Sequence, residues 1–314
     1  MRQMRPFPAG DRRPALVLGG GGAYGVIQAA YIQAAYEAGF RPSIIVGTSV
    51  GSLNGAWLAL HPDHPDELLR IWLGMDRLRL VELRPWRLAT RLVRRPLGLV
   101  ANDIVPRLVR EHLHGLDFSD ARLPLGVVAT NLTRGEKRVF SEGDLGTAIM
   151  ASTAIPGVFE PVDIDGDLYV DGCLTASVDL ATALTMGASE ILAIDLTPPP
   201  SLARPRTVLG VLRQSLGIMA HATTEAMEAC VSHSMPVRVV RPDLSKSSPW
   251  RLDDSAGAIA HNLLVARKEM SDVLQGDGSV RAHDGAPACA LPEAPAEPVT
   301  LRRYFHLRAR KQAG

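Results

Sequence analysis

The chain has 314 residues, of which 46% are hydrophobic and 21% are charged. This length allows one large domain or two ordinary ones, and the composition excludes a globally disordered protein. The 34 basic and 33 acidic residues leave a formal net charge of +1. This balance argues against a dedicated nucleic-acid-binding protein, which would usually be basic overall.

The cysteines and the N-terminal segment bear on the compartment of the protein. Cys173, Cys230 and Cys289 are widely spaced, which predicts neither a disulfide framework nor a zinc site and favours a reducing compartment. Residues 1–13 contain no apolar stretch of the kind that a Sec signal requires. We therefore expect a cytoplasmic protein without a transmembrane segment, in peripheral contact with a membrane surface.

The first 60 residues predict two strand–helix units in succession. An apolar run at 15–18 reads as a buried strand and is followed by a helical pattern at 25–38. A second apolar run at 44–46 precedes a second helical pattern at 50–60. Two strand-to-helix turns this close together predict a parallel α/β sheet covered by helices.

The rest of the chain continues the alternation of strands and helices. Further strands are expected at 125–130, 137–140, 162–164, 168–170, 191–194 and 237–240, and helices at 65–73, 145–153, 178–186, 207–234 and 253–274. We predict one α/β hydrolase domain over residues 1–275, with an Arg-rich helical insert at about 65–115. Residues 276–314 are expected to form an Ala/Pro/Gly-rich linker and a basic tail.

The most informative motif is Gly47-Thr48-Ser49-Val50-Gly51, between a predicted strand and a predicted helix. A nucleophile elbow requires this context, because a tight strand-to-helix turn holds the central serine hydroxyl exposed. The flanking glycines let the neighbouring backbone approach without a Cβ clash. An ordinary strand–helix turn is the alternative interpretation, and the flanking elements favour the elbow.

A glycine-rich motif, GGGGAYG at 19–25, also lies between a predicted strand and a predicted helix. Gly20, Gly22 and Gly25 fit the dinucleotide-binding fingerprint, but that fingerprint needs an acidic residue at the end of the second strand, where none is present. The other interpretation is an oxyanion hole formed by consecutive backbone N–H groups. A turn that only permits close packing is the third.

A serine nucleophile needs a base, and the nine histidines fall on predicted helices, on a Pro-rich surface stretch or near the C-terminus. A carboxylate is the alternative. Asp171 comes directly after a predicted hairpin strand, and Gly172 permits a tight turn there. Held against the serine hydroxyl in a partly desolvated site, this carboxylate can accept the proton. A strand-end aspartate can also be a simple turn former.

The combination of motifs resembles the patatin-like phospholipase family. It consists of GGGxxG, then GxSxG about 25 residues later, then Ala-Ser-x-Ala-Ile-Pro at 151–156 and Asp-Gly at 171–172. The resemblance implies a three-layer α/β/α sandwich with a mostly parallel central sheet. It further implies hydrolysis of acyl esters in lipids by a Ser–Asp dyad, without a required metal or other cofactor.

By position, the resemblance makes Ser49 the nucleophile and Asp171 the general base. The N–H groups around Gly20, Gly21 and Gly22 form the oxyanion hole, and the remaining motif glycines are Gly25, Gly47, Gly51 and Gly172. An acyl-serine would form and then be hydrolysed by water.

Three positions depart from the family pattern. Tyr24 stands where a cation is common, Cys173 replaces the second glycine of Asp-Gly-Gly, and residues 176–179 replace an Asn-Asn-x-Pro segment. A catalytically degenerate member that binds lipid or a partner is therefore a second hypothesis. A Rossmann-type nucleotide-binding protein is the third.

The charge is unevenly distributed along the chain. The stretch from Arg70 to Arg110 contains ten arginines and three acids, interleaved with Trp and Leu, and residues 301–314 add five more basic residues. Arginine with apolar side chains suits an anionic membrane surface. We expect transient membrane contact through the stretch from Arg70 to Arg110, although a solvated cap helix is the alternative.

Overall fold

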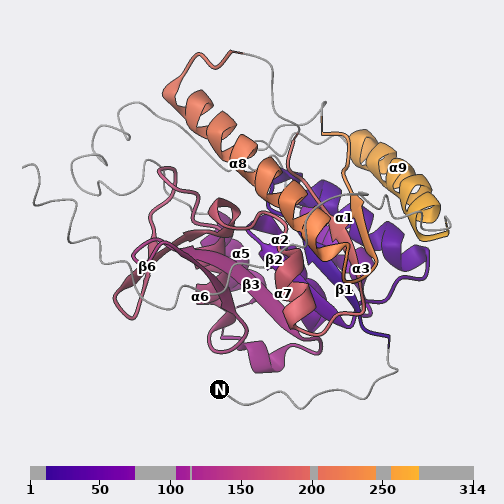
Figure 1. Cartoon of the computed structure of the whole chain (residues 1–314). Coiled ribbons are helices and arrows are strands. Elements are labelled where there is room, and N and C mark those ends of the chain that lie inside the picture. The colour runs from indigo at the N-terminus through magenta and orange to yellow at the C-terminus, as the bar shows by residue number, and fades with distance from the viewer. Residues whose placement is uncertain (1–11, 75–103, 114, 199–203, 245–255, 276–314) are drawn as a thin grey trace, which may run out of the picture. The chain divides into compact units, whose positions relative to one another are not determined.

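A computed structural model describes residues 12–74, 104–113, 115–198, 204–244 and 256–275. Within these residues an eight-stranded sheet forms the centre, with helices on both of its faces (Figure 1). The strands are β1 (Pro14–Leu18), β2 (Ile44–Thr48), β3 (Leu125–Asn131), β4 (Glu136–Phe140), β5 (Val162–Ile164), β6 (Asp167–Asp171), β7 (Glu190–Ile194) and β8 (Val237–Val240). The order across the sheet is β5-β6-β3-β2-β1-β7-β8, with β4 paired to β3.

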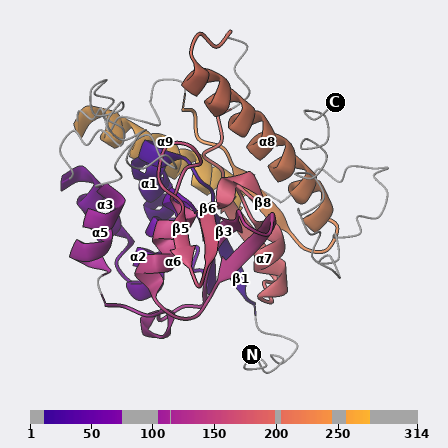
Figure 2. The same ribbon diagram turned by 90° about the vertical axis from the view of Figure 1, so that its left-hand side faces the viewer.

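The helices divide between the two faces of this sheet. They are α1 (Gly25–Glu37), α2 (Val50–Leu60), α3 (Pro65–Gly74), α5 (Ile104–His112), α6 (Leu145–Ser152), α7 (Leu180–Thr185), α8 (Val208–Val231) and α9 (Ala256–Gln275). Side chains alternate along each strand, so Leu16 and Leu18 of β1 enter the core beneath α1, α2, α3 and α9. Ala15 and Val17 enter the opposite core, beneath α7 and the end of α8. Figure 2 shows the strands between α2, α3 and α5 on one side and α7 and α8 on the other.

The three-layer α/β/α fold predicted from the sequence is confirmed. The strands β1, β2, β3, β7 and β8 pair in parallel, while β4, β5 and β6 are antiparallel additions at one edge. The hairpin turn between β5 and β6 has positive φ at Asp165 and Gly166, as a two-residue type I′ turn requires.

Two expectations about compartment and domain organisation are only partly addressed by the structure. No helix in the described residues is long and apolar enough to cross a membrane, and the cytoplasmic location stays a prediction. Residues 276–314 and most of the Arg-rich insert lie outside the described residues, so the predicted domain boundaries stay predictions.

The strand β3 brings together the ends of β2 and β6, where Ser49 and Asp171 lie. Its first half pairs in parallel with β2, with Thr48 opposite Val128. Its second half pairs with the antiparallel β6, with Asp171 opposite Ala129. The C-terminal ends of β2 and β6 are thus in register with successive residues of one strand. The residues that end these two strands therefore meet at one point of the sheet.

Candidate active site

Ser49 stands in a strained turn between β2 and α2. Its φ of 54° and ψ of −125° lie outside the regions that non-glycine residues favour, a conformation that costs about 1–3 kcal/mol and needs support from its surroundings. The Ser49 amide donates to Ser152 Oγ at 2.9 Å, and Ser152 in turn donates to the Val128 carbonyl at 2.6 Å. The elbow is thereby tied to the central strand β3.

The glycines on both sides of Ser49 are required by close backbone approach. A Cβ at Gly47 would overlap the carbonyl of Gly51, and a Cβ at Gly51 would overlap the carbonyl of Leu18. The first turn of α2 therefore packs directly on the β1 backbone. This contact brings the elbow next to the glycine-rich segment that follows β1.

Asp171, the last residue of β6, lies against the serine hydroxyl. Ser49 Oγ donates to Asp171 Oδ2 at 2.6 Å, and the amide of Cys173 donates to Asp171 Oδ1 at 2.9 Å. A Cβ at Gly172 would overlap the Val128 carbonyl, so only glycine lets the chain turn here. Both side chains are almost wholly buried, with Ser49 5% and Asp171 3% exposed.

The surroundings of Asp171 favour the protonated carboxyl more than water does. Burial raises the pKa of Asp171, while the hydrogen bonds from Ser49 and Cys173 oppose that shift. A raised carboxyl pKa makes the ionised form a stronger base. The neighbouring Cys173 thiol is also buried, and burial together with the Asp171 charge raises its pKa well above the usual value. Cys173 is therefore a neutral thiol at physiological pH.

The glycine-rich segment packs against the dyad. A Cβ at Gly20 would overlap Cys173 Sγ and press on Ser49 Cβ. The Gly20 amide donates to the Ser177 carbonyl at 3.3 Å, while Gly21 and Gly22 border the same cavity as Ser49 and Asp171. Of the three predicted oxyanion donors, Gly20 thus already has a backbone partner.

A buried amide network holds this segment in place. Gln28 donates to the carbonyl of Gly19 at 3.0 Å, and Asn54 donates to that of Gly25 at 3.0 Å and to Gln28 at 2.9 Å. Trp72 of α3 donates to Asn54 Oδ1 at 2.8 Å. Each buried polar group finds a partner, so the network fixes the position of the glycine-rich segment relative to α1, α2 and α3.

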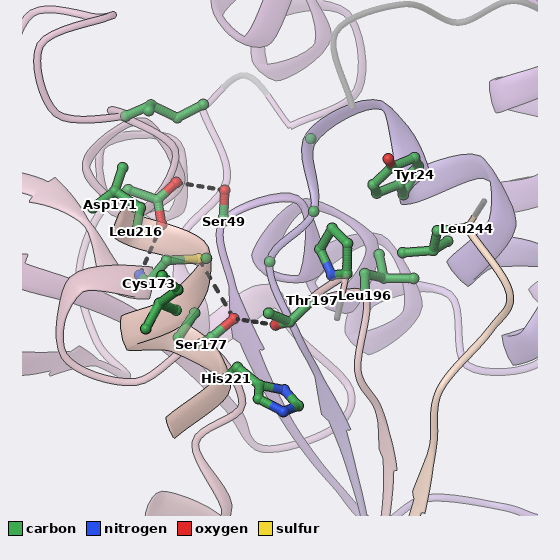
Figure 3. Close-up of a pocket in the computed structure, with 18 of the residues that line it drawn as sticks. Tyr24, Ser49, Asp171, Cys173, Ser177, Leu196, Thr197, Leu216, His221 and Leu244 are labelled. Atoms are coloured by element: carbon green, nitrogen blue, oxygen red, sulfur yellow. Dashed lines mark hydrogen bonds between the residues drawn. The ribbon is translucent and has the colours of Figure 1, made fainter. Parts of the chain in front are cut away.

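A cavity of about 810 Å³ opens at Ser49, within the range of small-molecule sites. Figure 3 shows Leu196, Leu244 and Tyr24 on one side of it, and Ser177 and His221 on another. Its apolar lining comes from Ile155, Pro156, Leu174, Leu196, Pro198, Leu216, Ile218, Ala220, Pro242 and Leu244. A largely apolar cavity that ends at a serine–aspartate pair can accept an extended apolar acyl group.

A set of polar side chains crosses the apolar lining. Ser177 and Thr197 share a hydrogen bond of 3.2 Å, and Thr197 donates its amide to the buried Asp195 at 2.8 Å. Arg241, which borders the cavity, forms ion pairs with Asp195 and Glu228. His221 borders the cavity as well, 3.2 Å from Glu225. The outer part of the cavity therefore combines apolar walls with paired charges.

The structure brings together the residues that the motifs singled out. Ser49, Asp171, Gly20, Gly21 and Gly22 border one cavity, and the remaining motif glycines supply close backbone contacts or the amide network. Sequence reasoning did not assign Ser152 a role, although the conspicuous segment at 151–156 contains it. It also missed the wall formed by α8, because the helical pattern of 207–234 says nothing about what the helix covers.

Comparison with known proteins places these observations in a family. A family model described as patatin-like phospholipase matches residues 16–184. An uncharacterized NTE family protein of Mycobacterium tuberculosis is 28% identical over 223 residues, covering 71% of this chain and 60% of that protein. The lysophospholipase nte1 of Emericella nidulans is 28% identical over 185 residues, covering 59% of this chain and 12% of that protein.

A solved structure supports the fold. The crystal structure of VipD from Legionella pneumophila aligns with a TM-score of 0.51 at 14% identity, covering 84% of this chain and 67% of that one. At this identity the likeness shows the fold alone. The present chain spans only about 60% of the length of the first curated relatives that it matches.

Proposed function

Since this chain belongs to the patatin-like phospholipase family, we propose that it is a serine lipid acyl hydrolase with Ser49 as nucleophile and Asp171 as general base. The observation that carries the proposal is the 2.6 Å hydrogen bond from Ser49 Oγ to Asp171 Oδ2 at the end of an apolar cavity. The relatives named lysophospholipase support a lipid substrate.

The first half of the reaction follows from these positions. Asp171 accepts the Ser49 proton while Oγ attacks the ester carbonyl, and the carbonyl oxygen takes up the negative charge. The N–H groups of Gly21 and Gly22 are the primary candidates to stabilise this oxyanion, because the Gly20 amide already donates to Ser177. The positive end of α2, which begins at Val50, favours the same charge. The ester bond then breaks, and the alcohol leaves with the proton from Asp171.

The second half regenerates the enzyme. Water attacks the acyl-serine and passes its proton to Asp171, and the fatty acid leaves as Ser49 recovers its hydroxyl. Both steps use the same carboxylate, so one dyad suffices without a histidine. The acyl chain would occupy the apolar walls near Leu196 and Leu244.

Fluorophosphonate labelling tests the nucleophile and the base. We expect covalent labelling of the wild-type chain at Ser49, no labelling of Ser49→Ala, and loss of ester cleavage by at least about 10³-fold in Asp171→Asn. The exposed Ser119 provides the control, since Ser119→Ala should be labelled as wild type is.

The alternative of a degenerate lipid-binding member is decided by the same samples. Tyr24 and Cys173 are the family departures that motivate it. Binding of lipid without labelling and without turnover of any ester would establish it and refute the hydrolase. The family match replaces the dinucleotide-binding interpretation of the glycine-rich motif.

We also propose transient membrane contact through the stretch from Arg70 to Arg110. Most of this stretch lies outside the described residues. Within the described part, Arg70 pairs with Asp66 and Arg107 pairs with Glu111 on the surfaces of α3 and α5. Reversal of Arg87, Arg91 and Arg94 to Glu should weaken vesicle binding and leave soluble-ester cleavage unchanged; unchanged vesicle binding would contradict the contact.

A further inference from the structure

Among the side chains that the structure describes, one outward face of the N-terminal half of α8 carries no charge. Val211 and Ile218, two turns apart on the helix, are 51% and 50% exposed, and Ser215 and Ala222 on the same face are exposed as well. Solvent-facing helix surfaces are usually charged or polar. The outer face of α5, for comparison, exposes Arg107, Arg110 and Glu111. We refer to Val211, Ser215, Ile218 and Ala222 as the α8 outer face.

This face is continuous with the cavity that holds Ser49. Ile218 is half-exposed and at the same time borders the cavity, as do its neighbours Leu216 and Gly217. The side chain of Leu212 lies near Gly157, beside the loop residues Ile155 and Pro156 that form another part of the cavity wall. An apolar chain in contact with the α8 outer face can therefore enter the cavity without leaving apolar surroundings.

The positive charge just before α8 indicates which kind of partner the α8 outer face would contact. Arg204 and Arg206, just before α8, are exposed, whereas the acidic residues Glu225 and Glu228 appear only in its second half. An apolar helix face next to exposed arginines suits the boundary between anionic head groups and acyl chains. Two half-exposed aliphatic side chains are far too little for a stable protein interface, which buries roughly 800 Å² per partner.

We propose that the α8 outer face, with Arg204 and Arg206, docks on an anionic lipid bilayer and passes a lipid acyl chain to the cavity. The proposal rests on the proposed hydrolase function for its purpose, but the docking itself can be measured without turnover. The α8 outer face lies on the other side of the sheet from α3 and α5, which carry the ends of the Arg-rich stretch (Figure 2). The docking is therefore separate from the membrane contact proposed for the stretch from Arg70 to Arg110, and the two sets of variants decide between them.

Vesicle co-sedimentation of the full chain carrying Ser49→Ala tests the docking. The vesicles are pure phosphatidylcholine and phosphatidylcholine mixed with phosphatidylglycerol. We expect tighter binding to the mixed vesicles, weakened by added salt. Val211→Asp should reduce binding to both by about tenfold or more, because a charge replaces an inserted aliphatic group. Arg204→Gln with Arg206→Gln should reduce binding only to the mixed vesicles.

Matched controls come from α9, where Leu264 is 62% exposed and Lys268 is exposed one turn later. Leu264→Asp and Lys268→Gln should bind vesicles as the parent does. Equal binding by the α8 variants and these controls would overturn the proposal. So would concentration-dependent self-association that Val211→Asp abolishes while vesicle binding persists, because the occupant would then be a second copy of the chain.

A soluble short-chain ester separates docking from catalysis. Val211 does not border the cavity, so Val211→Asp in the chain with an intact Ser49 should cleave that ester at the parent rate. A chain that binds vesicles as expected but cleaves no ester would refute the proposed hydrolase and retain the docking surface. A chain that cleaves the ester at the parent rate but does not bind vesicles as expected would refute the docking surface and retain the proposed hydrolase.

Discussion

The two ends of the cavity are built in different ways. The inner end, with the glycine-rich segment, Ser49 and Asp171, lies within residues 16–184 that match the family, and it is assembled from strand ends in backbone contact. The outer wall, formed by residues 196–198, α8 and 241–244, lies beyond that match and borders the cavity mainly with side chains. The positions of Ser49 and Asp171 are thus fixed by backbone packing, while the shape of the outer wall depends on replaceable side chains.

A pair of glycine substitutions provides the largest contrast between these ends. Gly172→Ala forces a Cβ onto the Val128 carbonyl, whereas a Cβ at Gly217 of α8 would meet no atom within 4 Å. We expect Gly172→Ala to lower the unfolding free energy by about 3 kcal/mol or more and to cut turnover at least about 10²-fold. Gly217→Ala should instead stabilise α8 by up to about 1 kcal/mol.

Thermal unfolding and soluble-ester kinetics measure both glycine variants. Equal tolerance of the two substitutions would contradict the division into a backbone-packed end and a side-chain wall.

The second prediction concerns Ser152. Its hydroxyl accepts a hydrogen bond from the Ser49 amide and donates one to the Val128 carbonyl. Ser152→Ala leaves a buried N–H without its acceptor, which costs roughly 1–3 kcal/mol. If this cost falls on the elbow conformation, kcat should drop about 10- to 100-fold while KM changes little, since Ser152 positions the nucleophile and does not border the cavity.

Thr153→Ala is the matched control, because the Thr153 hydroxyl donates to Ile149 within its own helix. A drop in kcat of the same size in both variants would show that Ser152 acts only through general stability of α6. Labelling by a fluorophosphonate probe should slow in Ser152→Ala alone.

The third and smallest effect is a dependence of stability on pH. Because burial raises the pKa of Asp171, the folded chain binds this proton more tightly than the unfolded chain. The resulting stabilisation is complete below the unfolded pKa of about 3.9 and is lost as the pH rises through the folded pKa. Asp171→Asn carries no such loss, so its stability relative to wild type should increase with pH across that window.

Activity should respond to pH in the opposite direction, because the ionised carboxylate is the base. The acid limb of kcat/KM should lie above the ordinary aspartate range. Urea unfolding of wild type, Asp171→Asn and Ser49→Ala at several pH values measures the stability term, and Ser49→Ala should retain the dependence. A difference between wild type and Asp171→Asn that stays constant with pH would refute the raised pKa.

The sequence predicted the inner end because its signals are local. The strand–helix turns, Ser49 between two glycines, and Asp171 before Gly172 can each be read within a few residues. The role of Ser152 could not be read in this way, because it depends on the β2–β3 pairing that brings Val128 beside the elbow. The Gly20 amide was predicted as an oxyanion donor but donates to the Ser177 carbonyl. This hydrogen bond could not be read from the sequence either, because Ser177 is far from Gly20 along the chain.

The outer wall was not predicted because amphipathicity identifies a buried face but not its partner. The pattern of residues 207–234 gave a helix, and α8 runs from Val208 to Val231. That Leu216 and Ile218 would border the cavity depends on how α8 packs on α7 and the turn after Asp171. The Arg-rich stretch predicted a membrane surface from composition, and this contact stays a prediction, because most of the stretch lies outside the described residues.

The meeting of β2 and β6 along β3 has a consequence for folding. Ser49 and Asp171 are 122 residues apart in the chain, and their hydrogen bond can form only after β6 has taken its place beside β3. Contacts of such long sequence separation form slowly, because the chain between them must first be ordered. Recovery of esterase activity during refolding should therefore lag behind recovery of helical signal. The recovered activity would then report the moment at which β6 has joined the sheet.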